Sequence, residues 1–153
     1  MLSCAICLTT TFVYIRTCNP TVTGGDNGEL VTAAYVLGVA HPPGYPLWTM
    51  LAALVIRLLD FTQWDVAYRV NLMSTVFGGI SAAFLFRSLV VWFDLCDENS
   101  RPKPSQAESK CGTPSNSCTK ERNVFFAVVG SMLFAFNPRV WHSSTHGEVW
   151  RGI

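Results

Sequence analysis

The chain has 153 residues, of which 50% are hydrophobic and 14% charged, and its formal net charge is +1. Such a balance provides no broad basic surface, which excludes a protein that binds nucleic acid through phosphate contacts. The apolar share, with a mean hydropathy of +0.30, instead favours a small set of membrane helices and makes membrane lipid an expected partner.

Four apolar segments follow one another along the chain, and each is predicted to be a helix. They cover about residues 1–18, 46–59, 70–93 and 123–136. A helix needs about 20 residues to cross the hydrocarbon core of a bilayer, and only the third segment reaches that length comfortably. The others must tilt or include flanking residues. The expected fold is therefore all-α, as a multi-helix, multi-pass integral membrane protein.

The first segment, residues 1–18, has two interpretations. It lacks a basic region at its start and a clearly placed small-residue cleavage site, so a membrane anchor is favoured over a signal peptide. Cys4 and Cys7 lie within it at a Cys-x-x-Cys spacing. Because no second cysteine pair or neighbouring His completes a metal site, both are interpreted as small residues of an apolar helix.

The loop over residues 19–45 is short but rich in polar side chains. Its first part is expected to be extended, because Pro20 and the pair Gly24–Gly25 stop a helix. The residues after Asp26 then show helical spacing of apolar side chains, at Leu30, Ala33, Ala34 and Leu37. This pattern predicts a short amphipathic helix, from Asn27 to Leu37, lying on the membrane surface.

Asp26 and Glu29 lie three residues apart at the start of this helix. One interpretation is a capping box, in which Asp26 accepts a hydrogen bond from the amide of Glu29, whose side chain reaches back to the amide of Asp26. The same fixed geometry would suit a general base, and charged groups beside a bilayer usually have a function. Amides at such a helix start also favour an anion such as phosphate. The sequence therefore predicts a polar site at the membrane face.

Two further candidate residues lie late in this loop, and a third follows it. His41 precedes Pro42–Pro43, which hold its backbone extended, and it is either a hydrogen-bonded structural residue or part of the site. Tyr45 suits the headgroup boundary of a bilayer. Arg69 lies at the end of a segment, where extension toward lipid headgroups is the ordinary explanation and phosphate binding is an open alternative.

Residues 94–122 form the low-hydrophobicity region of the chain, rich in Ser, Pro, Lys and Glu. This composition predicts a disordered or loosely held loop. Cys111 and Cys118 enclose part of it and would be able to pair if the loop faced an oxidising lumen. The sequence leaves that pairing open.

An aromatic and His-rich run follows the fourth segment. Within it, His142 and His146 have the i, i+4 spacing that two metal ligands on a helix would use, and Glu148 is close by. The H-E-x-x-H pattern of a zinc-binding helix is missing, so no metal and no bound cofactor are expected.

Two stretches of this chain resemble the signature of a known family. Residues 24–34, Gly-Gly-Asp-Asn-Gly-Glu-Leu-Val-Thr-Ala-Ala, and residues 37–47, Leu-Gly-Val-Ala-His-Pro-Pro-Gly-Tyr-Pro-Leu, are similar to the transmembrane O-mannosyltransferases that modify IPT domains of plexins and related receptors. The resemblance is to the N-terminal part of that family. Further family positions follow in the same order, at residues 67–72, Trp141 and Glu148–Val149.

Members of that family look like GT-C glycosyltransferases, which are multi-helix membrane enzymes of the endoplasmic reticulum. The resemblance implies an inverting protein O-mannosyltransferase, which moves mannose from a dolichyl-phosphate carrier to Ser or Thr of an acceptor such as an IPT-like domain. It implies that Asp26 is the catalytic base in the first lumenal loop, that Glu29 orients Asp26 or the acceptor, and that His41 contacts sugar or phosphate. The other positions assigned to substrate binding are Tyr45, Arg69 and Glu148.

Two other functions stay open at this point. In a transporter or channel fragment, Asp26 and Glu29 would line a polar path, but such a protein predicts ionisable residues inside the spans, whereas these cluster at segment ends. The other alternative is an inactive scaffold subunit, since the resemblance covers only part of a family member.

Overall fold

The computed structural model describes residues 1–100 and 116–146, and every regular element within these ranges is a helix. The elements in chain order are α1 (Leu2–Thr17), α2 (Asn27–Val36), α3 (Pro46–Leu58), the short 3₁₀ helix η1 (Asp60–Thr62), α4 (Val66–Ser100), α5 (Asn116–Ala135) and α6 (Pro138–His146). The all-α class predicted from the apolar segments is confirmed for this part of the chain.

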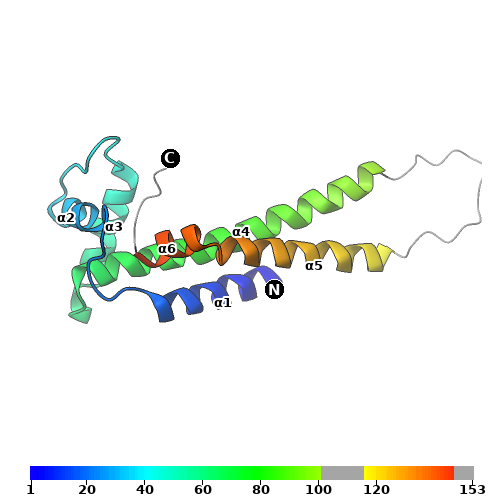
Figure 1. The fold of residues 1–153 in the computed structure, drawn as a ribbon, viewed down its shortest axis with the longest axis horizontal. Helices are drawn as coiled ribbons and strands as arrows, with labels where there is room; N and C mark the ends of the chain where they lie inside the picture. The colour runs from blue at the N-terminus through cyan, green and yellow to red at the C-terminus, as the bar shows by residue number, and fades with distance from the viewer. Residues whose placement is uncertain (101–115, 147–153) are drawn as a thin grey trace, which may run out of the picture.

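Helix α4 is the axis of the fold, and every other described α-helix contacts it. α1 runs along one side of it and α5 along another, so that the three form an elongated rod (Figure 1). α2 and α3 pack together at the end where α4 begins, and α6 lies against α4 between that end and α5. We call the part of the chain at this end, residues 19–65, the head.

Prolines set two of the helix boundaries. Pro46 and Pro138 are the first residues of α3 and α6, where the N–H that proline lacks would have no partner in the helix. Asn137 and Pro138 also interrupt the helix of the fourth segment, so the axes of α5 and α6 differ by 60°. α6 is a helix that the apolar pattern does not predict, because most of its residues are polar.

The predicted loop over residues 94–122 is wrong at both of its ends. α4 continues to Ser100, and α5 already begins at Asn116, so both helices run beyond their apolar residues. The possible pair of Cys111 and Cys118 falls outside the described residues and side chains. The described cysteine side chains are free thiols, those of Cys4, Cys7, Cys18 and Cys96.

Polar contacts between α4 and α5 explain why these two helices extend so far. The buried side-chain amide of Asn123 donates to Oδ1 of Asp94 at 3.1 Å and to Oδ2 of Asp97 at 2.7 Å. Arg122 forms an ion pair with Asp97 at 3.3 Å. Because each bond joins residues of different helices, the two helices stay paired where the apolar contacts end.

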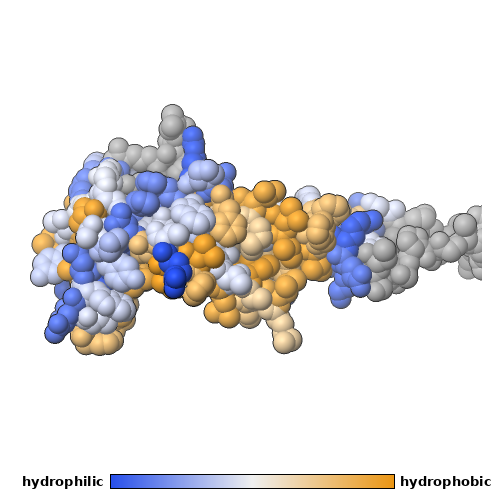
Figure 2. All heavy atoms as spheres, turned by 60° about the horizontal axis from the view of Figure 1, so that its bottom comes forward, coloured by the Kyte–Doolittle hydropathy of each residue, from blue (hydrophilic) through white to orange (hydrophobic). Residues whose placement is uncertain are grey.

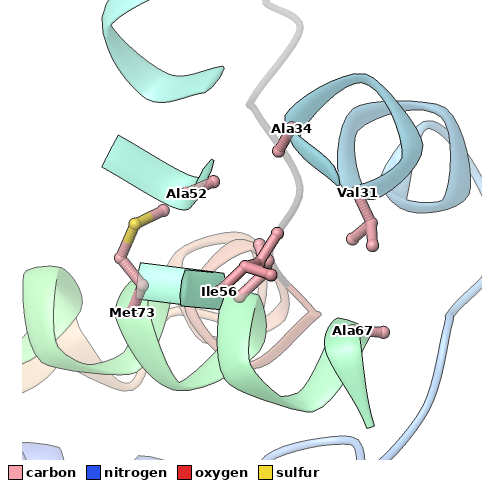
Figure 3. Close-up of a cluster of buried hydrophobic side chains, with 7 residues drawn as sticks. Val31, Ala34, Ala52, Ile56, Ala67 and Met73 are labelled. Atoms are coloured by element: carbon pink, nitrogen blue, oxygen red, sulfur yellow. The ribbon is translucent and has the colours of Figure 1, made fainter. Parts of the chain in front are cut away.

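A small apolar cluster joins the head to the rod. Val31 and Ala34 of α2 and Ile56 of α3 point toward α4 in Figure 3, and the whole cluster consists of Val31, Ala34, Ala52, Ile56, Ala67, Val70 and Met73. The helix predicted from Asn27 to Leu37 is therefore confirmed, but its apolar side is covered by protein. Leu37 departs from the predicted pattern, because it ends α2 in a left-handed conformation and is 53% exposed.

Two adjacent glycines let α1 and α6 approach α4 closely. A methyl group on Gly78 would lie 2.7 Å from the ring of Tyr14 on α1 and 2.5 Å from Oγ of Ser144 on α6. A methyl group on Gly79 would overlap the hydroxyl oxygen of Thr11 on α1. Because a side chain at either position would overlap atoms of a neighbouring helix, the packing of three helices depends on these glycines.

Within the described residues, α4 is the one single helix that is long and apolar enough to cross a membrane. The bent pair of α5 and α6 would count as a second span if it crosses as one unit, whereas α1 and α3 are apolar but shorter.

Figure 2 shows apolar side chains over the middle of the rod and hydrophilic ones toward both ends. Large exposed apolar residues occur on α1, α4 and α5 alike, for example Leu8, Phe84 and Leu133. Apolar surface of this kind marks a face that contacts lipid or another protein.

Replacing Gly78 with Ala is expected to lower the melting temperature of the protein in detergent, because the new methyl group would overlap both α1 and α6. Overpacking usually costs about 1–3 kcal/mol, which corresponds to a shift of roughly 2–10 °C. Gly130→Ala on α5 is the control, since its methyl group would meet only the end of the Leu89 side chain at 3.0 Å. Equal shifts in the two variants would contradict the close approach at Gly78.

Candidate active site

Asp26 is the N-cap residue, directly before α2, and Gly25 before it has a φ of 78°, which a glycine adopts without strain. The backbone carbonyl of Asp26 accepts the amide of Leu30 at 3.0 Å, as the first hydrogen bond of the helix. Within the described residues, the Asp26 carboxylate makes no capping hydrogen bond, so the predicted capping box is wrong. The carboxylate is 32% exposed, which makes it reachable from solvent.

The side chain of Glu29 shows why the capping box does not form. Its Oε1 accepts the backbone N–H of His41 at 2.7 Å, and its Oε2 lies 3.1 Å from the ring Nδ1 of the same residue. Two hydrogen bonds to His41 stabilise this carboxylate more than a single hydrogen bond from the amide of Asp26 would. Glu29 therefore holds His41, which is twelve positions later in the sequence, against the start of α2.

The contact with Glu29 selects between the two tautomers of the His41 ring. When Glu29 is ionised, its carboxylate can only accept hydrogen bonds, so Nδ1 of His41 then carries the hydrogen that faces it. The other ring nitrogen, Nε2, lies 3.8 Å from Oδ2 of Asp26. That distance is longer than a hydrogen bond, and a small donor such as a hydroxyl group between the two atoms would be able to contact both.

Asp26, Glu29 and His41 place one donor atom each within 4.8 Å of one another, and we call these three residues the trio. They form the one grouping of three or more potential metal ligands in the described part of the chain. A carboxylate bound to Nδ1, as Glu29 is here, also orients the imidazole in many metal sites. The arrangement would therefore be able to hold either a proton or a cation between Asp26 and Nε2.

The connection between α2 and α3 holds His41 through its own turn. The amide of Gly44, at a φ of 86°, donates to the carbonyl of His41 at 2.8 Å. Tyr45 follows in a left-handed conformation at the start of α3, and its ring packs edge-on against the ring of His41, with centroids 5.7 Å apart. Tyr45, predicted to bind substrate, thus lies beside the trio. Together with Trp48, Tyr45 also packs against a second small apolar cluster, which consists of Leu30, Ala33 and Ala40.

A pair of buried amides ties the trio to the rod, and the sequence patterns did not predict it. The side chains of Asn27 on α2 and Asn71 on α4 are fully buried, and Nδ2 of Asn27 donates to Oδ1 of Asn71 at 3.1 Å. Nδ2 of Asn27 also donates to the carbonyl of His146 at the end of α6. A signal was available, because Asn71 is a polar residue inside the apolar segment 70–93 and a buried amide needs partners.

The structure does not bring Arg69 into the trio. Its side chain is 7% exposed, and Nη1 donates to Oδ1 of Asp60 at 2.9 Å and to the carbonyl of Ile56 at 3.0 Å. Its Nε donates to the carbonyl of Trp64 at 3.0 Å. These bonds fasten the end of α3 to the start of α4, which supports a structural role for Arg69.

The two histidines of α6 stack on each other, with ring centroids 4.1 Å apart. Nδ1 of His146 lies 2.9 Å from Oγ1 of Thr145 and 3.1 Å from the carbonyl of His142. Neither histidine belongs to the grouping of potential metal ligands found among the described residues. Glu148, predicted to bind substrate, lies outside the described residues.

Comparison with known proteins identifies related sequences. Residues 26–151 match the family described as "Protein O-mannosyl-transferase TMEM260 N-terminal domain". The chain is 51% identical to the Mus musculus protein O-mannosyl-transferase TMEM260 over 84 residues, which is 55% of this chain and 12% of that relative. It is 29% identical to the Dictyostelium discoideum protein O-mannosyl-transferase tmem260 over 139 residues, which is 91% of this chain and 14% of that relative. The chain thus spans a small part of these relatives, and no solved structure matches it.

Replacing Glu29 with Ala is expected to speed hydrogen exchange at the His41 amide about tenfold, because Ala removes the oxygen that accepts this N–H. Exchange followed by mass spectrometry measures this rate. Asp65→Ala is the control, since the Asp65 carboxylate accepts a different amide, that of Ala67, at 2.8 Å. Unchanged exchange at His41 in the Glu29 variant would mean that Glu29 does not hold this loop.

Replacing Arg69 with Ala is expected to lower the melting temperature by roughly 5–10 °C, because the loss of its hydrogen bonds as a buried charged group should cost about 1.5–3 kcal/mol in total. The matched control is Arg57→Ala, which removes an exposed guanidinium from α3. A shift no larger than that of the control would contradict a structural role for Arg69.

Proposed function

Because this chain belongs to the protein O-mannosyl-transferase TMEM260 family, through the N-terminal domain of that family, we propose that it carries the catalytic carboxylate of an enzyme that transfers mannose to protein hydroxyl groups. The observation that carries the proposal is the trio, in which the half-buried carboxylate of Asp26 faces a histidine held by Glu29. A general base needs this combination of a reachable side chain and a fixed position.

In the proposed reaction, the hydroxyl oxygen of an acceptor Ser or Thr attacks C1 of mannose on a dolichyl-phosphate carrier. The bond from the acceptor oxygen to C1 forms while the bond from C1 to the phosphate oxygen breaks. Dolichyl phosphate leaves with the electron pair of that bond, and the configuration at C1 inverts. The hydroxyl proton passes to the carboxylate of Asp26, which makes the acceptor oxygen a better nucleophile.

Glu29 and His41 support this step through position. A hydroxyl group between Oδ2 of Asp26 and Nε2 of His41, which are 3.8 Å apart, can donate to either atom. Because Glu29 keeps the hydrogen on Nδ1, the lone pair of Nε2 is available to receive the proton from Asp26 after transfer. In this scheme Glu29 orients His41, and His41 in turn orients the acceptor.

The arrangement of apolar and polar surface suits a donor that is a lipid. A polyprenyl chain partitions into the bilayer, whereas its sugar phosphate needs a polar site at the membrane face. The trio lies in the head, at one end of the apolar rod (Figures 1 and 2). The first turn of α2, whose amides point toward that site, would favour the phosphate.

The proposed setting is a GT-C-like, multi-pass enzyme of the endoplasmic reticulum membrane. With α1 running from the cytosol to the lumen, the head and its trio face the lumen, where acceptor domains such as IPT-like domains fold. Because this chain spans 12–14% of its relatives, we assign the rest of the acceptor and donor sites to the remainder of a full-length protein.

Asp26→Asn in the full-length protein is expected to lower kcat for mannose transfer from dolichyl-phosphate mannose to an IPT-domain acceptor by about 100- to 10,000-fold. Asn has nearly the same shape but cannot take up the proton, so KM should change little. Asp65→Asn is the matched control, as the same substitution elsewhere in the head. Unchanged kcat would remove Asp26 from catalysis, and a wild type without transfer would favour a transporter or scaffold.

A further inference from the structure

We propose that Asn27 and Asn71 are positioning residues, which hold Asp26 where it can act on the acceptor; this inference rests on the proposed function. Neither side chain belongs to the trio. Asn27 directly follows Asp26 in the chain, and Asn71 lies on α4, in the rod. The pair therefore links the carboxylate to the most extended element of the fold.

The Asn27 amide collects hydrogen bonds from three directions. Its Oδ1 accepts the backbone amide of Thr23 at 3.2 Å, which ties it to the loop before α2. Its Nδ2 donates to Oδ1 of Asn71, on α4, and to the carbonyl of His146, at the end of α6. Both hydrogens of the amide group are thereby used, and its oxygen is used as well.

The Asn71 amide holds the same loop at two earlier positions. Its Nδ2 donates to the carbonyl of Asn19 at 3.0 Å and to the carbonyl of Thr21 at 3.3 Å. The backbone amide of Asn19 in turn donates to the carbonyl of Thr145 on α6, at 3.3 Å. The segment that leads into Asp26 is thus bonded to both α4 and α6.

These bonds flank Asp26 on both sides in the sequence. The loop at residues 19–23 precedes it, Asn27 follows it, and both are fixed to the same pair of helices. The rotation of α2 about its axis, which sets the direction of the Asp26 side chain, is therefore tied to α4. A displacement of about 1 Å at a reacting group can reduce a rate about 100-fold.

The choice of amides over charged residues also fits a positioning role. A third carboxylate beside Asp26 and Glu29 would repel both of them, and a cation would pair with them. The two amides share one hydrogen bond, and their other donors and acceptors are satisfied by backbone groups without any charge. They fix the position of Asp26 and leave its charge unchanged.

Asn71→Ala in the full-length protein tests the inference, because it removes the pair without changing the sequence of α2. The expected result is a kcat at least 10-fold below wild type per folded molecule, with KM for dolichyl-phosphate mannose and for the acceptor within about twofold. Hydrogen exchange at the Thr23 amide should become faster, since its acceptor Asn27 loses its own partner.

The matched control is Asn123→Ala, which removes another buried amide with two hydrogen bonds, at the opposite end of α4. It should lower the melting temperature but leave kcat per folded molecule within about twofold of wild type. If Asn71→Ala does not yield folded protein, Asn71→Ser is the alternative, because its hydroxyl group can still form a hydrogen bond. In that variant kcat should fall by a smaller factor, again with little change in KM.

Equal kcat in the Asn71 variants and the Asn123 control would overturn the inference, as would a rise in KM with kcat unchanged. Both results presuppose an active wild type. A wild type that transfers no mannose would instead count against the proposed function, and faster exchange at Thr23 would then show only that Asn71 orders the loop. The two failures are therefore distinguishable.

Discussion

The hydrogen bond between the side chains of Asn27 and Asn71 joins two parts of the molecule that differ in chemistry. One part is the head, in which a short polar loop carries two carboxylates. The other is a rod built around α4, a helix of 35 residues with a largely apolar sequence. Amides suit this junction because they supply donors and acceptors together, whereas an ion pair would require the desolvation of two charges.

The same junction accounts for α6. This helix has nine residues, most of them polar, and such a short helix is not stable by itself in water. Its position comes from neighbours: Gly78 allows Ser144 to lie against α4, and Asn27 takes the carbonyl at its C-terminal end. The break at Asn137–Pro138 thus turns the chain out of the line of α5 and toward the head.

The sequence predicted most of what depends on local pattern. The four apolar segments correspond to α1, α3, α4 and α5, and the sequence indicates all three residues of the trio as candidates for the site. Three of the failures share one cause, which is a partner distant in sequence. Glu29 bonds His41 instead of forming a capping box, Asn123 extends α4 and α5 through polar contacts, and Asn27 meets Asn71. Residue spacing along a single chain carries no information about such pairs.

The bond from Asn27 to the carbonyl of His146 spans 119 residues of sequence. At about 5–20 residues per second of translation, the ribosome adds the second partner roughly 6–24 s after the first. During that interval the segment around Asp26 can already contact Asn71 on α4, but it cannot contact α6. The set of hydrogen bonds that holds Asp26 is therefore complete only after α6 has been synthesised.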